Sequence, residues 1–154
     1  MNGTTLSEAH RKLARLVGTW VGEEKMFPSP WLPEGGTATG KVENTSGVGG
    51  LIVVQEYRQE RDGVVTFQGH GVFAHDPVKG KVVMHWFDSM GPTPNIYEGD
   101  FEGNTLNMTM QMSEGWSKAS FELTSPDSYT FGMDVSQDGK NWAPMMKGSY
   151  TRKE

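Results

Sequence analysis

Cysteine is absent from all 154 residues of the chain. Its absence excludes disulfide bonds, thiolate metal ligands and cysteine nucleophiles, and it is compatible with a reducing compartment. Long apolar runs are missing as well, because no segment approaches the roughly 18–20 residues that span a bilayer. The polar start "MNGTTLSEAHRK" lacks the apolar core of a signal peptide. We therefore expect a cytoplasmic protein without a membrane partner.

Positive charge is scarce and scattered. The chain has 14 Lys and Arg residues against 19 Asp and Glu, which gives a formal net charge of −5. The basic residues form no stripe, and this argues against nucleic acid as a partner. The length suits one domain over residues 1–154, with enough chain to bury a core.

Helical periodicity is confined to residues 7–17. Ser7 suits the N-cap position, and Leu13 and Leu16 recur at helical spacing. Gly18 then ends the helix. We expect His10 of this helix, and His75 farther along the chain, at the surface.

The rest of the chain reads as short strands separated by turns. Alternation of apolar and polar residues is clearest over 105–112, and a second such strand follows from about 117 to 124. A loop over 113–116 would place Met110 opposite Ala119. The side chains expected on one shared inner face of the C-terminal strands are Leu106, Met108, Met110, Met112, Ala119, Phe121, Leu123, Tyr129, Phe131, Met133, Val135, Trp142, Met146 and Tyr150.

We count about nine or ten antiparallel strands in up-and-down order after the single helix. An all-β chain with one apolar face closes economically as a barrel, because closure removes the exposed edges. A two-sheet sandwich is the structural alternative.

Residues near both ends of the chain resemble the pattern of a known group of barrels. Gly18 and Trp20 open the first strand, Arg152 lies on the last, and this pattern resembles the calycin barrels, which include the lipocalins. The resemblance implies that the tryptophan closes one barrel end while the C-terminal cation packs across its ring, a contact with a physical basis in the quadrupole of the indole.

The chain more closely resembles a bacterial family known only as a domain of unknown function with a lipocalin-like barrel. The resemblance covers nearly the whole length and implies the fold but no established activity. Its motifs are Gly18-Thr19-Trp20, Asp76-Pro77 with Gly80, Trp86-x-Asp88-Ser89-Met90 and Tyr150-Thr151-Arg152.

The nitrobindins are a related barrel group that binds haem. They also begin with a Gly-x-Trp strand, followed by a Tyr-Pro element to which Phe27-Pro28 corresponds here. The resemblance implies a haem-ligating histidine near the C-terminus, but this chain has no histidine after His85. We therefore favour binding of another small molecule over haem binding, and we expect no cofactor.

Three histidines fall between residues 70 and 85. A four-residue connection over 77–80 pairs the two strands around it, and this places His70 and His85 on one face. Continuing upstream through the Asp62-Gly63 turn, we expect Gln55 and Tyr57 on that same face, pointing into the barrel.

A register shifted by one residue would reverse these directions, because successive side chains on a strand point to opposite sides. In either register the Trp86 ring is expected close to the backbone of Gly71. The side chains that the alternative register turns inward are Gly69, Gly71, Phe73, Met84, Trp86 and Asp88.

Metal and catalytic sites find little support in this histidine-containing region. A zinc site needs three or four converging ligands, and His75 faces away from His70 because their spacing is odd. Glu23 and Glu24 alternate across a strand, so they do not form a facing pair. No Gly-x-Ser-x-Gly element is present, and we assign no metal ligands and no catalytic residues.

The inner methionines have two readings. Methionine is flexible and polarizable, so these side chains either fill a small barrel or line the cavity of a wider one. We favour the cavity. The proline-rich segment 26–36 carries Phe27 and Trp31 and is either a lid over the barrel mouth or a loop packed on the outer wall.

We therefore expect the chain to bind a small, mostly apolar molecule in the barrel lumen. A small enzyme that acts on an apolar substrate through a lumenal His/Asp cluster is the alternative, and a homodimer formed through outer faces is compatible with either. The candidate ligand-binding residues are Gln55, Tyr57, His70, His85, Trp86, Met108, Met110, Phe121, Phe131, Met133 and Trp31.

Overall fold

The computed structural model describes residues 5–30 and 32–153. Within them lie one α-helix, one short 3₁₀-helix and ten strands. None of the helices in these residues is long and apolar enough to cross a membrane. The elements are α1 (Glu8–Ala14), β1 (Gly18–Met26), β2 (Gly36–Gly47), η1 (Val48–Gly50), β3 (Ile52–Arg61), β4 (Val64–Asp76), β5 (Lys81–Asp88), β6 (Gly91–Glu102), β7 (Thr105–Met112), β8 (Gly115–Ser125), β9 (Ser128–Ser136) and β10 (Ala143–Arg152).

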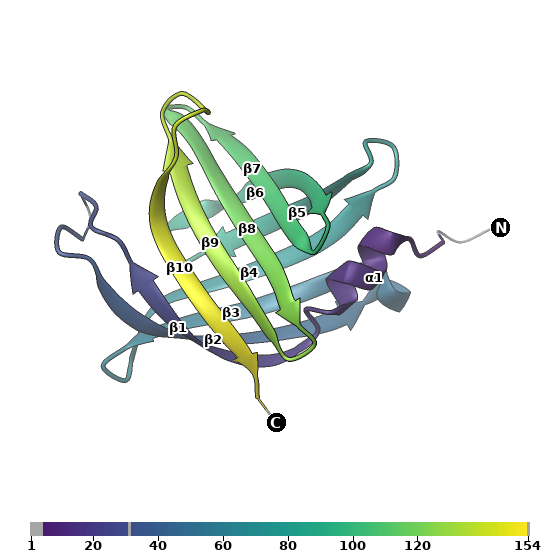
Figure 1. Cartoon of the computed structure of the whole chain (residues 1–154), viewed down its shortest axis with the longest axis horizontal. Coiled ribbons are helices and arrows are strands. Elements are labelled where there is room, and N and C mark those ends of the chain that lie inside the picture. Colours follow the sequence, from purple (N-terminus) through teal and green to yellow (C-terminus); the bar gives the residue numbers. More distant parts are fainter. Residues whose placement is uncertain (1–4, 31, 154) are drawn as a thin grey trace.

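The strands form a closed antiparallel barrel (Figure 1). Each strand pairs with its neighbours in the chain, and β1 pairs with β10 to complete the ring. Closure satisfies the backbone groups that would otherwise lie free at two sheet edges. The predicted barrel is confirmed, and the sandwich alternative is wrong.

The helix occupies one end of the barrel, where it contacts β3 and β4 (Figure 1). It is shorter than the predicted 7–17, since after Ala14 the chain continues in tighter turns. The amides of Leu16 and Val17 donate to carbonyls three residues back. Leu13 and Leu16 are buried, so the helix and the turn that follows it close the barrel end with apolar side chains.

Trp20 and Arg152 complete this closure. The Trp20 indole N–H donates to the Leu16 carbonyl at 2.8 Å, and the Arg152 guanidinium lies over the ring at 4.2 Å from its centroid. Arg152 also donates to the carbonyls of Val17 and Pro126, at 2.7 and 2.9 Å. The cation–ring packing implied by the resemblance to calycin barrels is present.

A β-bulge decides which side chains of β4 face inward. Gln59 pairs with Phe67 but Glu60 pairs with Val65, so Thr66 is an extra residue in β4. Without Thr66, the two strands joined by the Asp62-Gly63 turn would pair Gln55 with His70. That pairing underlies the prediction that both side chains point into the barrel. An extra residue reverses the facing of everything beyond it.

The predicted inward placement of His70 and His85 is therefore wrong. Gln55 lies opposite Gly71 in the structure, not opposite His70. The β4–β5 hairpin itself pairs as expected, with His70 opposite Phe87 and a four-residue connection between Asp76 and Lys81. The inward side chains of the two strands are those of the alternative register.

Other deviations are local. Met112 pairs with Gly115 across a tight turn, so Met108, rather than Met110, lies opposite Ala119. Met112 is exposed. Trp142 packs against Lys118, whose ammonium lies 4.4 Å from the ring centroid, and this contact draws Trp142 to the outer side of the barrel.

His10 is buried, which contradicts the expected surface position. Its Nδ1 accepts a hydrogen bond from the Ser7 amide at 2.9 Å, and its ring meets His75 edge to face at 5.6 Å. Burial lowers the pKa of His10 below its ordinary value, and the neighbouring His75 lowers it further. The neutral ring thus anchors the start of α1.

We expect Arg152→Met to lower the free energy of unfolding by about 2–3 kcal/mol, because the substitution removes hydrogen bonds from a charged donor and a cation–π contact. Arg58→Met is the control, since Arg58 is exposed and its one ion pair within the described residues is with Glu60, and such exposed pairs contribute about 0–1 kcal/mol. Urea unfolding measures both. Equal losses would contradict the role given to Arg152.

We expect stability to fall as the pH drops below about 6.5, the ordinary pKa of histidine in an unfolded chain. The unfolded state then binds a proton that folded His10 resists, so acid favours unfolding. His10→Gln keeps an N3 side chain able to accept from the Ser7 amide and removes the titration. Its stability should decline less between neutral pH and about pH 5, whereas His85→Gln, at an exposed site, should behave like the parent.

Candidate ligand cavity

The barrel encloses a cavity of about 310 Å³. It is bounded by residues from every strand except β7 and by the connection between β1 and β2, which lies at the barrel end away from α1 (Figure 1). Hollows of about 330 and 490 Å³ also occur, but the charged side chains of Lys41 and Glu43 line one and those of Lys81 and Glu98 the other. The internal cavity is therefore the candidate site.

Apolar and aromatic side chains make up most of the cavity wall. The predicted methionine-rich lining is present, although its members differ in part from those expected. The methionines are Met26, Met84, Met133, Met145 and Met146, and the aromatic residues are Phe27, Tyr57, Phe67, Trp86, Tyr97, Phe121, Tyr129, Phe131 and Tyr150.

The candidate residues named from the sequence fall into four groups, of which the two histidines are described below. Six line the cavity: Gln55, Tyr57, Trp86, Phe121, Phe131 and Met133. Met108 is buried in the core and Met110 packs against it, so neither reaches the cavity. Trp31 lies outside the described residues.

His70 and His85 lie on the outer surface. The His70 ring contacts the Glu56 carboxylate and remains 43% exposed, and His85 is exposed on β5. The bulge at Thr66 is the reason why both side chains point outward, although the sequence predicted them inside the barrel. The cavity wall consequently contains no histidine among the described residues, and the suggested lumenal His/Asp cluster does not form there.

Trp86 lies flat against two glycines of β4. An ideal Cβ on Gly69 would fall 2.1 Å from Trp86 Cζ2, and one on Gly71 would fall 3.0 Å from Cε3. The indole N–H donates to Asp88 Oδ2 at 2.8 Å. The expected cover of Gly71 by the ring is confirmed, and the pair of glycines makes room for it.

Glu24 is a functional candidate that the sequence suggested only as half of a facing pair with Glu23, an interpretation rejected above. It is only 2% exposed and points to the inside of β1. A signal was available, because Glu24 has the same strand parity as Trp20, which the calycin pattern places inward. Among the described residues, Glu24 has no basic partner within ion-pair distance.

Neutral donors surround the Glu24 carboxylate instead. The Tyr57 hydroxyl donates at 2.7–2.8 Å and the Gln59 amide at 3.0 Å, and the Tyr150 hydroxyl also donates to it. Burial raises the pKa of Tyr57 and of Tyr150, and the adjacent Glu24 charge raises both further. Both phenols therefore keep their protons and act as donors.

Glycines provide the space for Glu24 and Tyr150, as they do for Trp86. An ideal Cβ on Gly40 would fall 2.3 Å from Glu24 Oε2, and one on Gly22 would fall 2.2 Å from the Tyr150 ring. Tyr150 in turn stacks on Tyr129, with 4.9 Å between ring centroids. The backbone of β1 and β2 thus leaves a recess that holds the carboxylate and the phenol side by side.

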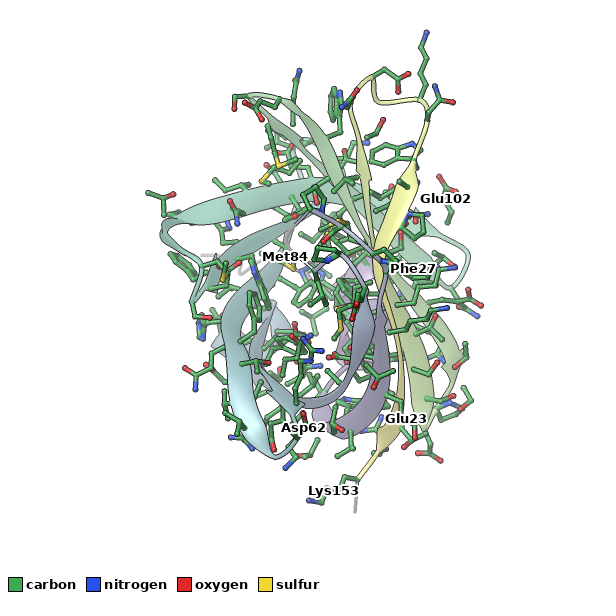
Figure 2. The ribbon with its side chains drawn as sticks, turned by 90° about the vertical axis from the view of Figure 1, so that its left-hand side faces the viewer. Glu23, Phe27, Asp62, Met84, Glu102 and Lys153 are labelled. Atoms are coloured by element: carbon green, nitrogen blue, oxygen red, sulfur yellow. The ribbon has the colours of Figure 1, made fainter. Side chains whose placement is uncertain are left out.

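The segment after β1 closes over part of the cavity. Phe27, Ser29 and Leu32 contribute to the wall, and the Phe27 amide donates to the Met145 carbonyl at 2.9 Å. Figure 2 looks at the molecule from this side, and Phe27 and Met84 lie over the middle of the barrel. The sequence left open whether this segment covers the barrel mouth or packs on the outer wall, and Phe27 contributes to the cavity wall.

A closed ten-strand antiparallel barrel that combines a Trp–Arg closure with an internal cavity belongs to the lipocalin-like barrels. Over residues 5–152 the sequence matches the family described as "Protein of unknown function (DUF1579)", and the chain belongs to that family. No curated protein matches the chain.

Two solved structures share the fold. Rv2717c from M. tuberculosis superimposes with a TM-score of 0.70 at 16% identity, over 97% of this chain and 100% of that one. The S-type phycobiliprotein lyase CPES from Guillardia theta gives 0.64 at 8% identity, over 97% and 99%. At these identities the likeness is one of fold.

We expect Gly69→Ala to destabilise the protein by about 1–3 kcal/mol, because the new methyl group would overlap the Trp86 ring and force it into the cavity. Gly132→Ala in β9 is the matched control, since its added Cβ meets no atom within 4 Å. The unfolding free energies of both variants should also be measured in a Trp86→Ala background. There Gly69→Ala should cost much less, and an undiminished cost would exclude the ring as the cause.

Proposed function

We propose that this protein binds a small, mostly apolar molecule in the barrel lumen. The observation that carries the proposal is the cavity of about 310 Å³, which remains although many large side chains point inward. Its size lies at the lower end of the range of about 300–1,000 Å³ that ligand pockets occupy.

The composition of the wall supports an apolar ligand. Transfer of apolar surface from water into such a lining contributes about 0.8 kcal/mol per methylene group. Methionine side chains adapt to irregular shapes, so the five methionines of the wall suit ligands of varied outline. The aromatic rings add large, rigid contact surfaces at low entropic cost.

A few polar groups interrupt this wall, and they suit the orientation of a ligand. Gln55, Tyr57 and Gln59 project from one face of β3 toward the cavity. Asp88 also lines it, but one carboxylate oxygen accepts from the Trp86 indole and the other from the Met90 amide. The group near Gln55 and Tyr57 is therefore the better anchor for a polar end of the ligand.

The n-alkanols test this proposal as a series of increasing chain length, measured by titration calorimetry. Affinity should rise about fourfold with each methylene until the chain fills the cavity, and then level off. Met146→Trp should weaken binding of the longer alkanols because the larger ring occupies cavity space. Met90→Trp, at a residue 78% exposed, should leave binding unchanged.

Absence of binding across the whole series would refute a ligand-binding lumen. So would equal affinities in the parent protein and in a folded Met146→Trp variant, since binding would then occur outside the cavity. Met133→Phe gives a smaller filling change for the same comparison if Met146→Trp does not fold.

A further inference from the structure

The charge of the lumen restricts the ligand further, provided that the lumen is a binding site as proposed above. No Lys, Arg or His side chain contributes to the cavity wall in the described part of the chain. Two carboxylates lie at or just behind this wall, Asp88 at its surface and Glu24 behind the hydroxyls of Tyr57 and Tyr150. The interior is therefore negative without an internal counter-charge.

Glu24 is the more consequential of the two carboxylates. Hydrogen bonds from Tyr57, Tyr150 and Gln59 satisfy its oxygens, but all three donors are neutral. A buried charge without a partner of opposite sign is costly, because the low local dielectric screens it poorly. A cation in the cavity would relieve that cost.

The hydroxyls that contact Glu24 also have a fixed direction. Tyr57 and Tyr150 each have one proton, and each donates it to the carboxylate. The Tyr57 oxygen also accepts from the Gln59 amide at 3.2 Å, so it keeps one lone pair while the Tyr150 oxygen keeps two. Donation to an anion strengthens both oxygens as acceptors. A ligand that meets them must bring hydrogen-bond donors.

Gln55 supplies an independent indication of a polar ligand end. Its side chain lines the cavity and is only 5% exposed, yet its amide makes no hydrogen bond within the described residues. Because Gln55 lines the cavity, its amide can be reached from the cavity space and can pair with a polar group of a ligand there. Gln55 lies two residues before Tyr57 on the same face of β3, so one ligand group can reach both.

Aromatic faces complete the surroundings. The ring centroids of Tyr57 and Trp86 are 6.2 Å apart. The backbone of β4 covers one face of Trp86, so the ring can offer a ligand only its other face. Cations bind favourably to such faces, most strongly where water is excluded. An anionic head group would instead meet the tyrosine oxygens, ring faces and the Asp88 carboxylate, with the Glu24 carboxylate just behind them.

We propose that the lumen accepts a protonated organic amine. Its apolar body lies among the methionines and aromatic rings, and its ammonium group donates to the hydroxyls of Tyr57 and Tyr150 and to the carbonyl of Gln55. The buried charge of Glu24 balances the ligand charge across those hydroxyls.

Three ligands of equal chain length test this inference: n-octylamine, n-octanol and octanoate, titrated calorimetrically into the parent protein at neutral pH. Octylamine should bind about tenfold more tightly than octanol, which corresponds to one desolvated cation–π or charge-assisted contact. Octanoate should bind more weakly than either. Octanol binding without any preference for the amine would overturn the inference and leave the proposed function intact, whereas no binding of any of the three would refute both.

Glu24→Gln isolates the charge. It should reduce the ratio of octylamine to octanol affinity to near one, whereas Glu23→Gln, at the exposed neighbouring position on the outer face of β1, should preserve the parent ratio. An unchanged ratio in Glu24→Gln would contradict the role of the carboxylate. If that variant does not fold, Tyr57→Phe removes one acceptor and should lower the ratio several-fold for the same reason.

Discussion

The closed backbone ladder is the constraint on which this structure depends. Pairing of β1 with β10 leaves no free edge, so no strand can slide without breaking bonds on both sides. Side-chain direction therefore alternates rigidly around the whole ring. Placement of every lumenal group, including Glu24 and Gln55, follows from this rigidity and from the few bulges that interrupt it.

Much of this arrangement could be predicted from the sequence, because much of it is local. Strand 105–112 was predicted at its observed bounds, and the four-residue connection between β4 and β5 fixed their pairing correctly. The direction of His70 and His85 could not be predicted in the same way. Their direction depends on Thr66, an extra residue inside an ordinary alternating stretch. No turn residue or glycine beside Thr66 indicates the bulge in the sequence.

The interior of the barrel favours specificity over maximal stability. An apolar residue in place of Glu24 would avoid the cost of burying a charge, yet the chain surrounds this carboxylate with three donors and leaves a glycine, Gly40, to admit it. Tyr150 occupies a second space of the same kind against Gly22. An all-apolar interior would be more stable at this point. The arrangement instead gives the lumen one polar side, where Glu24 and its donors lie, against an otherwise apolar wall.

The helix end of the barrel has a consequence for the timing of exchange. Leu13, Leu16 and the Trp20–Arg152 pair close this end of the barrel in the described part of the chain. If the lumen binds a ligand as proposed, exchange would take place at the opposite end, beside Phe27. An incoming molecule would then have to wait until the bound one has left, and adding more of a competing compound would not shorten the dwell time.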